Sequence, residues 1–170
     1  GAGEEITEGV DNTAVGRHSV ANTTTGNRNT GIGTVALHTN TTGDNNTALG
    51  WYSSHLNTTG SSNVAIGYTA LKANTTASNN TAVGYESLKS NTTGTANTVV
   101  GSNAMQDTTT GSNSVAIGHH ALDANTTAGS NCAVGWYAAA SSNATRFTAF
   151  GHQALQFNTH SDNTAVGYTT

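Results

Sequence analysis

The chain has no proline, one cysteine and very few charged residues. Charged side chains make up 8% of its 170 residues, with five Lys or Arg against nine Asp or Glu. Five cations in a chain of formal net charge -4 cannot build the basic face that a phosphate backbone requires. We therefore expect no nucleic-acid partner.

The single cysteine, Cys132, excludes a disulfide within the chain and fits no metal-ligand spacing. It takes the place of a Thr or Val in the other repeats, which predicts a small buried side chain. No stretch approaches the roughly 20 apolar residues of a membrane-spanning helix, so we expect no membrane insertion of this segment. Calcium-binding repeats, nucleophile motifs and phosphate loops are also missing from the sequence. We expect no catalytic residue, no metal, no cofactor and no enzymatic activity.

A short repeat takes the place of these motifs. Ten glycines follow one another at seven intervals of 17 residues and then two of 16. Around them the phrase Asn-Thr-Ala-Val-Gly returns, followed by Ala-Leu and then by Asn-Thr-Thr-Gly. A 17-residue unit is too short for a pair of helices and fits one turn of a β-coil. The glycines, which we expect to turn the chain where the backbone needs a positive φ, are Gly16, Gly33, Gly50, Gly67, Gly84, Gly101, Gly118, Gly135, Gly151 and Gly167.

Each repeat is expected to contain two short strands. Val64 and Ile66 lie two residues apart, so in an extended chain they point to the same side. We predict that this side faces the core, while the intervening Ala65 allows a second surface to approach closely. Leu71 supplies a second core residue in the other half of the coil. A helix is excluded because Gly, Asn and Thr are poor helix formers and no apolar stripe of helical period survives.

The fold class predicted is all-β, a parallel β-solenoid of about ten 17-residue coils. The repeat domain covers residues 11–170, and residues 1–10, with Glu4, Glu5 and Glu8, form a linker or cap. Each coil offers about three apolar side chains, too few to stabilise a lone chain. We therefore expect a homo-oligomer packed side by side through the alanine-bearing faces.

Asparagines recur four residues before most of the glycines. Stacked in register, their side-chain amides are expected to bond to the amides above and below, as in cross-β stacks. Ser114 and Phe147 interrupt this column. The structural ladder comprises Asn12, Asn29, Asn46, Asn63, Asn80, Asn97, Asn131 and Asn163.

An aromatic column follows the glycines and is the candidate ligand-binding surface. Aromatic rings can stack on sugars, and Trp and Tyr are favoured at recognition surfaces. The alternative is that the rings cover a corner of the coil or pack between protomers. The candidate glycan-binding residues are Trp51, Tyr52, Tyr68, Tyr85, Trp136 and Tyr137.

Histidines and threonines suggest less. The seven histidines are spread over different repeat positions and are not expected to form one column. His119 and His120 would point to opposite faces, a poor metal geometry. Paired threonines such as Thr58 and Thr59 leave ice binding open, although one of each pair is expected to point away. The Asn-Thr-Thr sequons are interpreted as composition rather than glycosylation sites.

Two stretches carry a family resemblance. The segments 63–67, Asn-Val-Ala-Ile-Gly, and 112–118, Ser-Asn-Ser-Val-Ala-Ile-Gly, resemble head repeats of trimeric autotransporter adhesins, the YadA-like left-handed parallel β-roll. The segment 80–88, Asn-Thr-Ala-Val-Gly-Tyr-Glu-Ser-Leu, resembles repeats of bacteriophage tail fibres. The adhesin repeats are shorter than 17 residues, so the turns must differ.

The resemblance implies a homotrimer of β-rolls in an extracellular fibre, on a virion tail or a bacterial surface, that reaches a cell-surface glycan or receptor. A phage tail fibre is the preferred hypothesis. The alternatives are a bacterial trimeric adhesin head, a subunit of a self-assembling extracellular filament and an ice-binding β-solenoid.

Overall fold

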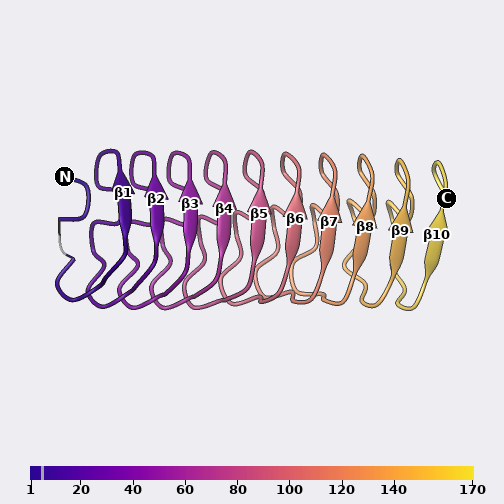
Figure 1. Cartoon of the computed structure of the whole chain (residues 1–170). Coiled ribbons are helices and arrows are strands. Elements are labelled where there is room, and N and C mark those ends of the chain that lie inside the picture. Colours follow the sequence, from indigo (N-terminus) through magenta and orange to yellow (C-terminus); the bar gives the residue numbers. More distant parts are fainter. Residues whose placement is uncertain (5) are drawn as a thin grey trace.

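The computed structural model describes residues 1–4 and 6–170, so Glu5 lies outside the described residues. The chain is an all-β solenoid in which one short parallel strand per coil stacks into a single ten-stranded sheet (Figure 1). No helix occurs in the described part of the chain. The strands are β1 (Thr13–Val15), β2 (Thr30–Ile32), β3 (Thr47–Leu49), β4 (Val64–Ile66), β5 (Thr81–Val83), β6 (Thr98–Val100), β7 (Val115–Ile117), β8 (Cys132–Val134), β9 (Thr148–Phe150) and β10 (Thr164–Val166).

The repeat period sets the register of the sheet. From β1 to β8 each residue pairs with the residue 17 positions later, as in Thr81↔Thr98. The last two pairings, Cys132↔Thr148 and Thr148↔Thr164, keep the same alignment over 16 residues. The shortened repeats therefore lose their residue outside the strands, and equivalent side chains still form columns along the rod.

The second half of each coil is not a strand, so the prediction of two strands per coil is wrong. Residues two and four positions after the glycine adopt left-handed backbone angles, as at Glu86 (φ 53°) and Leu88 (φ 50°). This alternation prevents an extended chain. The segment still bonds to the next coil through its backbone, for example from Leu88 N–H to Ala104 C=O at 3.0 Å.

The interior face of the sheet is also the reverse of the prediction. The middle residue of the strand is buried, as Ala82 is at 0% exposure, whereas its neighbours Thr81 and Val83 are only partly covered. A Cβ added at inward-facing Gly31 would lie 2.5 Å from Val20 Cγ2. The space between the sheet and the opposite wall thus generally admits little more than a methyl group.

The core is a thin layer between these inward residues and a row of larger ones. Opposite the alanines lie fully buried side chains that include Leu71, Leu88, Met105 and Leu122. Because alanines occupy most inward positions, the Val, Ile, Leu and Phe side chains of the strands face outward, except Val99, which is buried at the middle of β6. Cys132 also lies in an outward position and is partly exposed rather than buried.

All ten repeat glycines have a positive φ, between 113° and 142°. Gly84 illustrates why: its φ is 137°, and a Cβ there would collide with the carbonyl of Gly101 in the next coil. Few residues other than glycine accept this conformation and this close approach.

The predicted asparagine column bonds mainly to backbone rather than to itself. Asn80 Oδ1 accepts the Asn97 backbone N–H at 3.0 Å, and Asn80 Nδ2 donates to Gly94 C=O at 2.9 Å. A direct amide contact, from Asn63 Nδ2 to Asn46 Oδ1, measures 3.1 Å. Ser114 continues the column, since its Oγ accepts the Asn131 N–H at 3.2 Å.

The amide-to-amide ladder lies instead in the Asn-Thr-Thr segments. Asn74 Nδ2 donates to Asn57 Oδ1 at 2.7 Å, and Asn91 Nδ2 donates to Asn74 Oδ1 at 3.1 Å. Each amide also reaches the turn carbonyl of its own coil, as Asn74 does with Ala77 at 2.9 Å. These asparagines are 0% exposed, so they are inaccessible to glycosylation.

We predict that Asn74→Ala lowers the free energy of unfolding by about 1–3 kcal/mol for each buried partner left without a hydrogen bond. Denaturant unfolding measures the loss. The matched control is Thr76→Ala, at an exposed position two residues away, which should leave stability nearly unchanged. Equal stability of the two variants would contradict a structural role for the ladder.

Candidate ligand-binding surface

The aromatic column forms a continuous stack in the first half of the rod. Trp51 and Tyr68 are parallel within 10° at a centroid distance of 4.9 Å, and Tyr68 and Tyr85 within 7° at 5.1 Å. Because the repeat places these residues in successive coils, their rings adopt the spacing of the coils. All three side chains are exposed, by 43–51%.

A second stack occupies the other half of the rod. Trp136 lies 4.6 Å from His152, and His152 lies 4.7 Å from Tyr168, with near-parallel rings. His119 continues the stack at 6.4 Å from Trp136. Ser102 occupies the intervening coil, so the two stacks are separate.

Tyr52 and Tyr137 flank the tryptophans rather than extending the stacks. Their centroids lie 4.0 Å from Trp51 and 4.2 Å from Trp136 respectively. Both tyrosines have a left-handed φ, 54° and 52°, which places them around the corner of the coil. The candidate residues therefore form two clusters rather than one site.

The stacking limits how a sugar could bind. Tyr68 is stacked on both sides, so it presents only its ring edge and hydroxyl to solvent. Ring faces are what stack against the C–H side of a sugar. At the ends of this stack the next coils carry the small residues Thr34 and Ser102, so the outer faces of Trp51 and Tyr85 are the places for such contact.

Three histidines come together beside this stack, contrary to the expectation of scattered rings. His38 and His55 are parallel within 15° at 5.5 Å, and His18 lies 6.1 Å from His38. Tyr52 lies 4.7 Å from His55. The 17-residue spacing of His38 and His55 could have revealed this pair, whereas His18 belongs to a different repeat position and gave no such signal.

The histidines line a cavity of about 340 Å³ with Arg17, Val35 and Tyr52. Burial, followed by the nearby His38 and Lys72, lowers the pKa of His55. The Nδ1 atom of His55 is buried without a hydrogen-bond partner. The cavity therefore combines cationic, titratable and aromatic groups on one concave surface.

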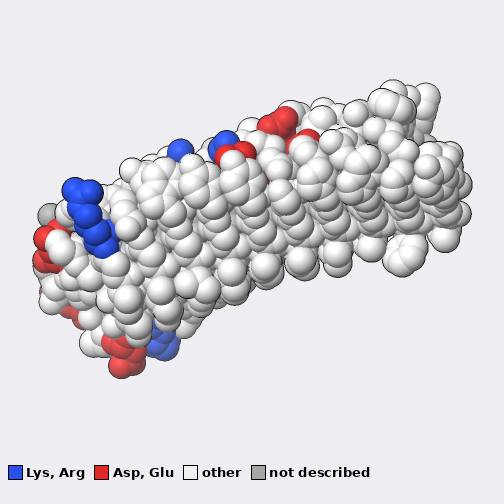
Figure 2. All heavy atoms as spheres, turned by 90° about the horizontal axis from the view of Figure 1, so that it is seen from above, with Lys and Arg blue, Asp and Glu red and all other residues white. Residues whose placement is uncertain are grey.

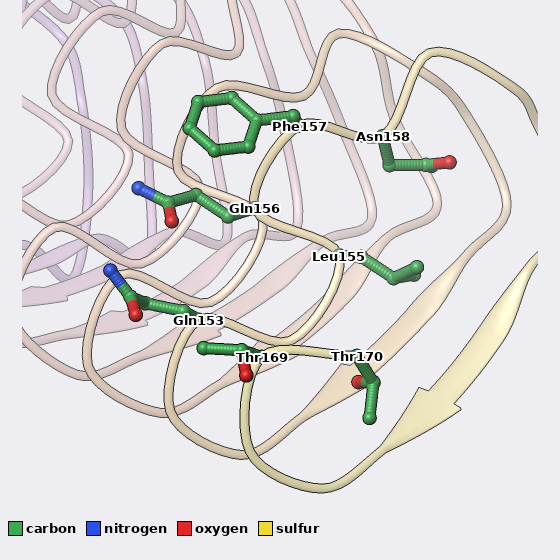
Figure 3. Close-up of a pocket in the computed structure, with 7 residues that line it drawn as sticks. All are labelled: Gln153, Leu155, Gln156, Phe157, Asn158, Thr169 and Thr170. Atoms are coloured by element: carbon green, nitrogen blue, oxygen red, sulfur yellow. The ribbon is translucent and has the colours of Figure 1, made fainter.

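A larger hollow of about 420 Å³ lies at the last coil, lined by neutral residues (Figure 3). Leu155 lies there and is partly exposed, whereas the equivalent Leu122 is covered by the following coil. None of the residues that line this hollow has a charged side chain.

The paired threonines take part in the hydrogen bonds between coils. Thr41 Oγ1 donates to Thr58 C=O at 3.0 Å, and this bond recurs along most of the column, so the hydroxyl of the first threonine is engaged by the next coil while the second threonine is exposed. Residues 1–4 and 6–170 include no group of three His, Cys, Asp or Glu placed to hold a metal ion. Within the same ranges, no helix is long and apolar enough to cross a membrane.

Comparison with known proteins returned no match: no family model, no curated protein and no solved structure resembles the chain significantly.

We predict that His55 makes the fold less stable in acid. Since its pKa in the folded chain lies below the ordinary 6.5, the folded state disfavours the protonated ring. Its neutral form contributes stability above pH 6.5, and this contribution falls as the pH drops toward the folded pKa. His55→Gln, which copies Gln106 of another coil, should reduce the loss of thermal stability below that pH. An unchanged pH profile of Tm would contradict this.

Proposed function

We propose that this chain is a structural and adhesive segment of an extracellular trimeric fibre, of the kind found in phage tail fibres, with no enzymatic role. Its mechanical role is to form a stiff rod that holds a recognition surface away from the particle or cell that carries it. Three copies of the coil, left-handed as the family resemblance implies, pack side by side along their length.

The observation that carries this proposal is the outward apolar column of the sheet. Leu49, Ile117 and Phe150 are 42%, 40% and 54% exposed. An ordinary monomer shows a largest apolar patch of about 300–600 Å², often a functional one. Here a single column runs the whole length of the sheet: Val15, Ile32, Leu49, Ile66, Val83, Val100, Ile117, Val134, Phe150 and Val166.

A second copy of the chain is the occupant that this column fits best. The column has the same length and 17-residue spacing as the rod, so another rod of the same repeat matches it along its length. The column contains no charged residue. Seen from above, the rod has its charged groups near the N-terminal end and along one edge (Figure 2). The prediction that protomers touch through their alanine-bearing faces is wrong, because strand alanines such as Ala65 and Ala82 are 0% exposed inside the coil.

We predict a solution mass of about three times 17.2 kDa by light scattering. Leu49→Asp/Ile117→Asp should reduce it to the mass of one chain, because a buried carboxylate without a partner opposes association. Thr76→Asp, an exposed charge on another side of the coil, is the matched control and should keep the mass of the parent.

A monomeric parent chain, or a double variant that still forms the same oligomer, would overturn association through the outward column. In a single chain these outward side chains contact solvent, so the two substitutions should not unfold it. If the double variant unfolds while the parent chain does not, the outward column is an interface that the fold needs for its stability.

The adhesive role predicts glycan binding through the aromatic clusters. Trp51→Ala/Trp136→Ala should remove binding to the positive members of a glycan array while leaving the circular dichroism spectrum of the fold unchanged. Loss of an aromatic ring that stacks on a nucleobase costs about 1–3 kcal/mol, and we expect a loss of similar size here, roughly tenfold to hundredfold in affinity. Full binding by the folded double variant would remove the tryptophans from the recognition surface.

Ice binding is a second candidate, favoured by one observation. The outward face of the sheet repeats Thr and an aliphatic side chain in two regular columns, as at Thr47 and Leu49. Such an array would act in a monomer with its face open to solvent. Thermal hysteresis by a chain with the mass of one copy would support this function over the fibre.

A further inference from the structure

A basic column runs beside the first aromatic stack. Residues five positions after the repeat glycine lie above one another, since each carbonyl accepts a backbone hydrogen bond from the preceding coil, as His55 C=O does from Thr39 N–H at 3.2 Å. In the second to fifth coils this position holds a His or Lys, and in the coils on either side it is neutral or acidic. In order it reads Ala21, His38, His55, Lys72, Lys89, Gln106, Asp123, Ala140 and Gln156.

Two of these coils border the cavity already described. Arg17 lines this cavity together with His38 and His55, and Lys72 Nζ lies 5.8 Å from the centre of the ring of Tyr52, another lining residue. The rings of His38 and His55 lie 5.5 Å apart, so they would repel each other when both are protonated. An anion bound against both rings would offset this repulsion. One protein carboxylate near this group is that of Glu4, whose Oε2 lies 3.2 Å from His18 Nδ1.

The second half of the rod contains a version of this junction in which a carboxylate is built in. There Asp123 takes the basic-column position and contacts His120 Nδ1 at 2.5 Å, and His120 lies 4.8 Å from Tyr137. The coil therefore places a carboxylate against an imidazole beside a tyrosine at this corner. In the first half Tyr52 is the equivalent of Tyr137, but His38 replaces Asp123 and Val35 replaces His120. A cavity lined by these residues and by His55 takes the place of the carboxylate–imidazole contact.

We propose that this cavity binds a carboxylate-bearing sugar residue. Arg17, His38 and His55 hold the carboxylate, and the rings of Tyr52 and Trp51 pack against the sugar. Charge-assisted hydrogen bonds fix the acid, while aromatic contact supplies apolar burial. The proposal deepens the adhesive function and rests on it for its biological role, and it assigns acidic glycans to the first aromatic cluster alone.

Acid binding should strengthen as the pH falls. The groups that face His55 are Arg17, His18, His38, Tyr52 and Lys72, with Glu4 beside His18. Imidazole is the side chain whose charge changes between about pH 5 and pH 8, so the pH dependence comes from the histidines of this group. Protonation adds positive charge, and a bound carboxylate stabilises the protonated rings in return.

The test is a titration monitored by the NMR signals of the histidine rings at about pH 5.5 and about pH 8. The probes are oligosaccharides of galacturonate and of N-acetylneuraminate, each beside its methyl ester, which keeps the sugar and removes the charge. We expect at least one acid to bind about tenfold or more tightly than its ester, and more tightly at the lower pH. The shifted signals should be those of His38 and His55.

The variants copy residues from other coils so that the fold is retained. His38→Gln/His55→Gln reproduces Gln106, and Arg17→Thr reproduces Thr34. Both should abolish the preference for the acid. His160→Gln changes an exposed histidine in another coil and should bind as the parent does.

Three results would overturn the acidic site. The acid and its ester could bind equally, the variants could bind as the parent does, or neither acid could bind at millimolar concentration. None of these results bears on the fibre, because the mass of the chain and the glycan array test that separately. If the parent chain binds a neutral sugar and Trp51→Ala/Trp136→Ala loses that binding, the adhesive function stands and the specificity for acidic sugars does not.

Discussion

Every coil depends on its neighbours for its backbone hydrogen bonds, and this constraint organises the rest of the molecule. The strand of a coil is three residues long and the remainder is turn, so few of its N–H and C=O groups can pair within the coil. They pair with the coils on either side at the 17-residue spacing. A proline would remove a donor from this pattern, which fits its complete absence. The asparagines extend the same pattern, since Asn74 links two coils and closes a turn of its own.

The second constraint is thickness. The inside of the coil is a single layer between inward alanines such as Ala82 and larger side chains such as Leu88. So thin an interior excludes the β-branched residues of the strand from most inward positions, and they cover the outside instead. A chain of this kind buries little apolar area and exposes a long apolar column. The same narrowness therefore explains both the small core and the surface that we propose for association.

The stacking that holds the coils together also brings surface side chains into columns. Trp51, Tyr68 and Tyr85 stack because their positions repeat, and the spacing of the coils suits aromatic rings. This regularity makes the differences between coils informative. The two halves of the rod share an aromatic pattern but differ in charge five residues after the glycine, where His38 and His55 in one half correspond to Asp123 and Ala140 in the other. The acidic-sugar hypothesis depends on that difference rather than on the aromatic column.

The sequence by itself determined the solenoid, its register and its glycine turns, because a 17-residue period allows one alignment of coil on coil. It also indicated the aromatic column, since identical repeat positions must lie above one another. The tertiary structure alone decided which face of the strand is inside, because alternation fixes that Val64 and Ile66 share a side but not which side has room. It also decided that Asn57 and Asn74 form the amide ladder and that His18 joins His38 and His55. Those contacts depend on how left-handed turns fold the second half of the coil, and local sequence pattern does not encode that path.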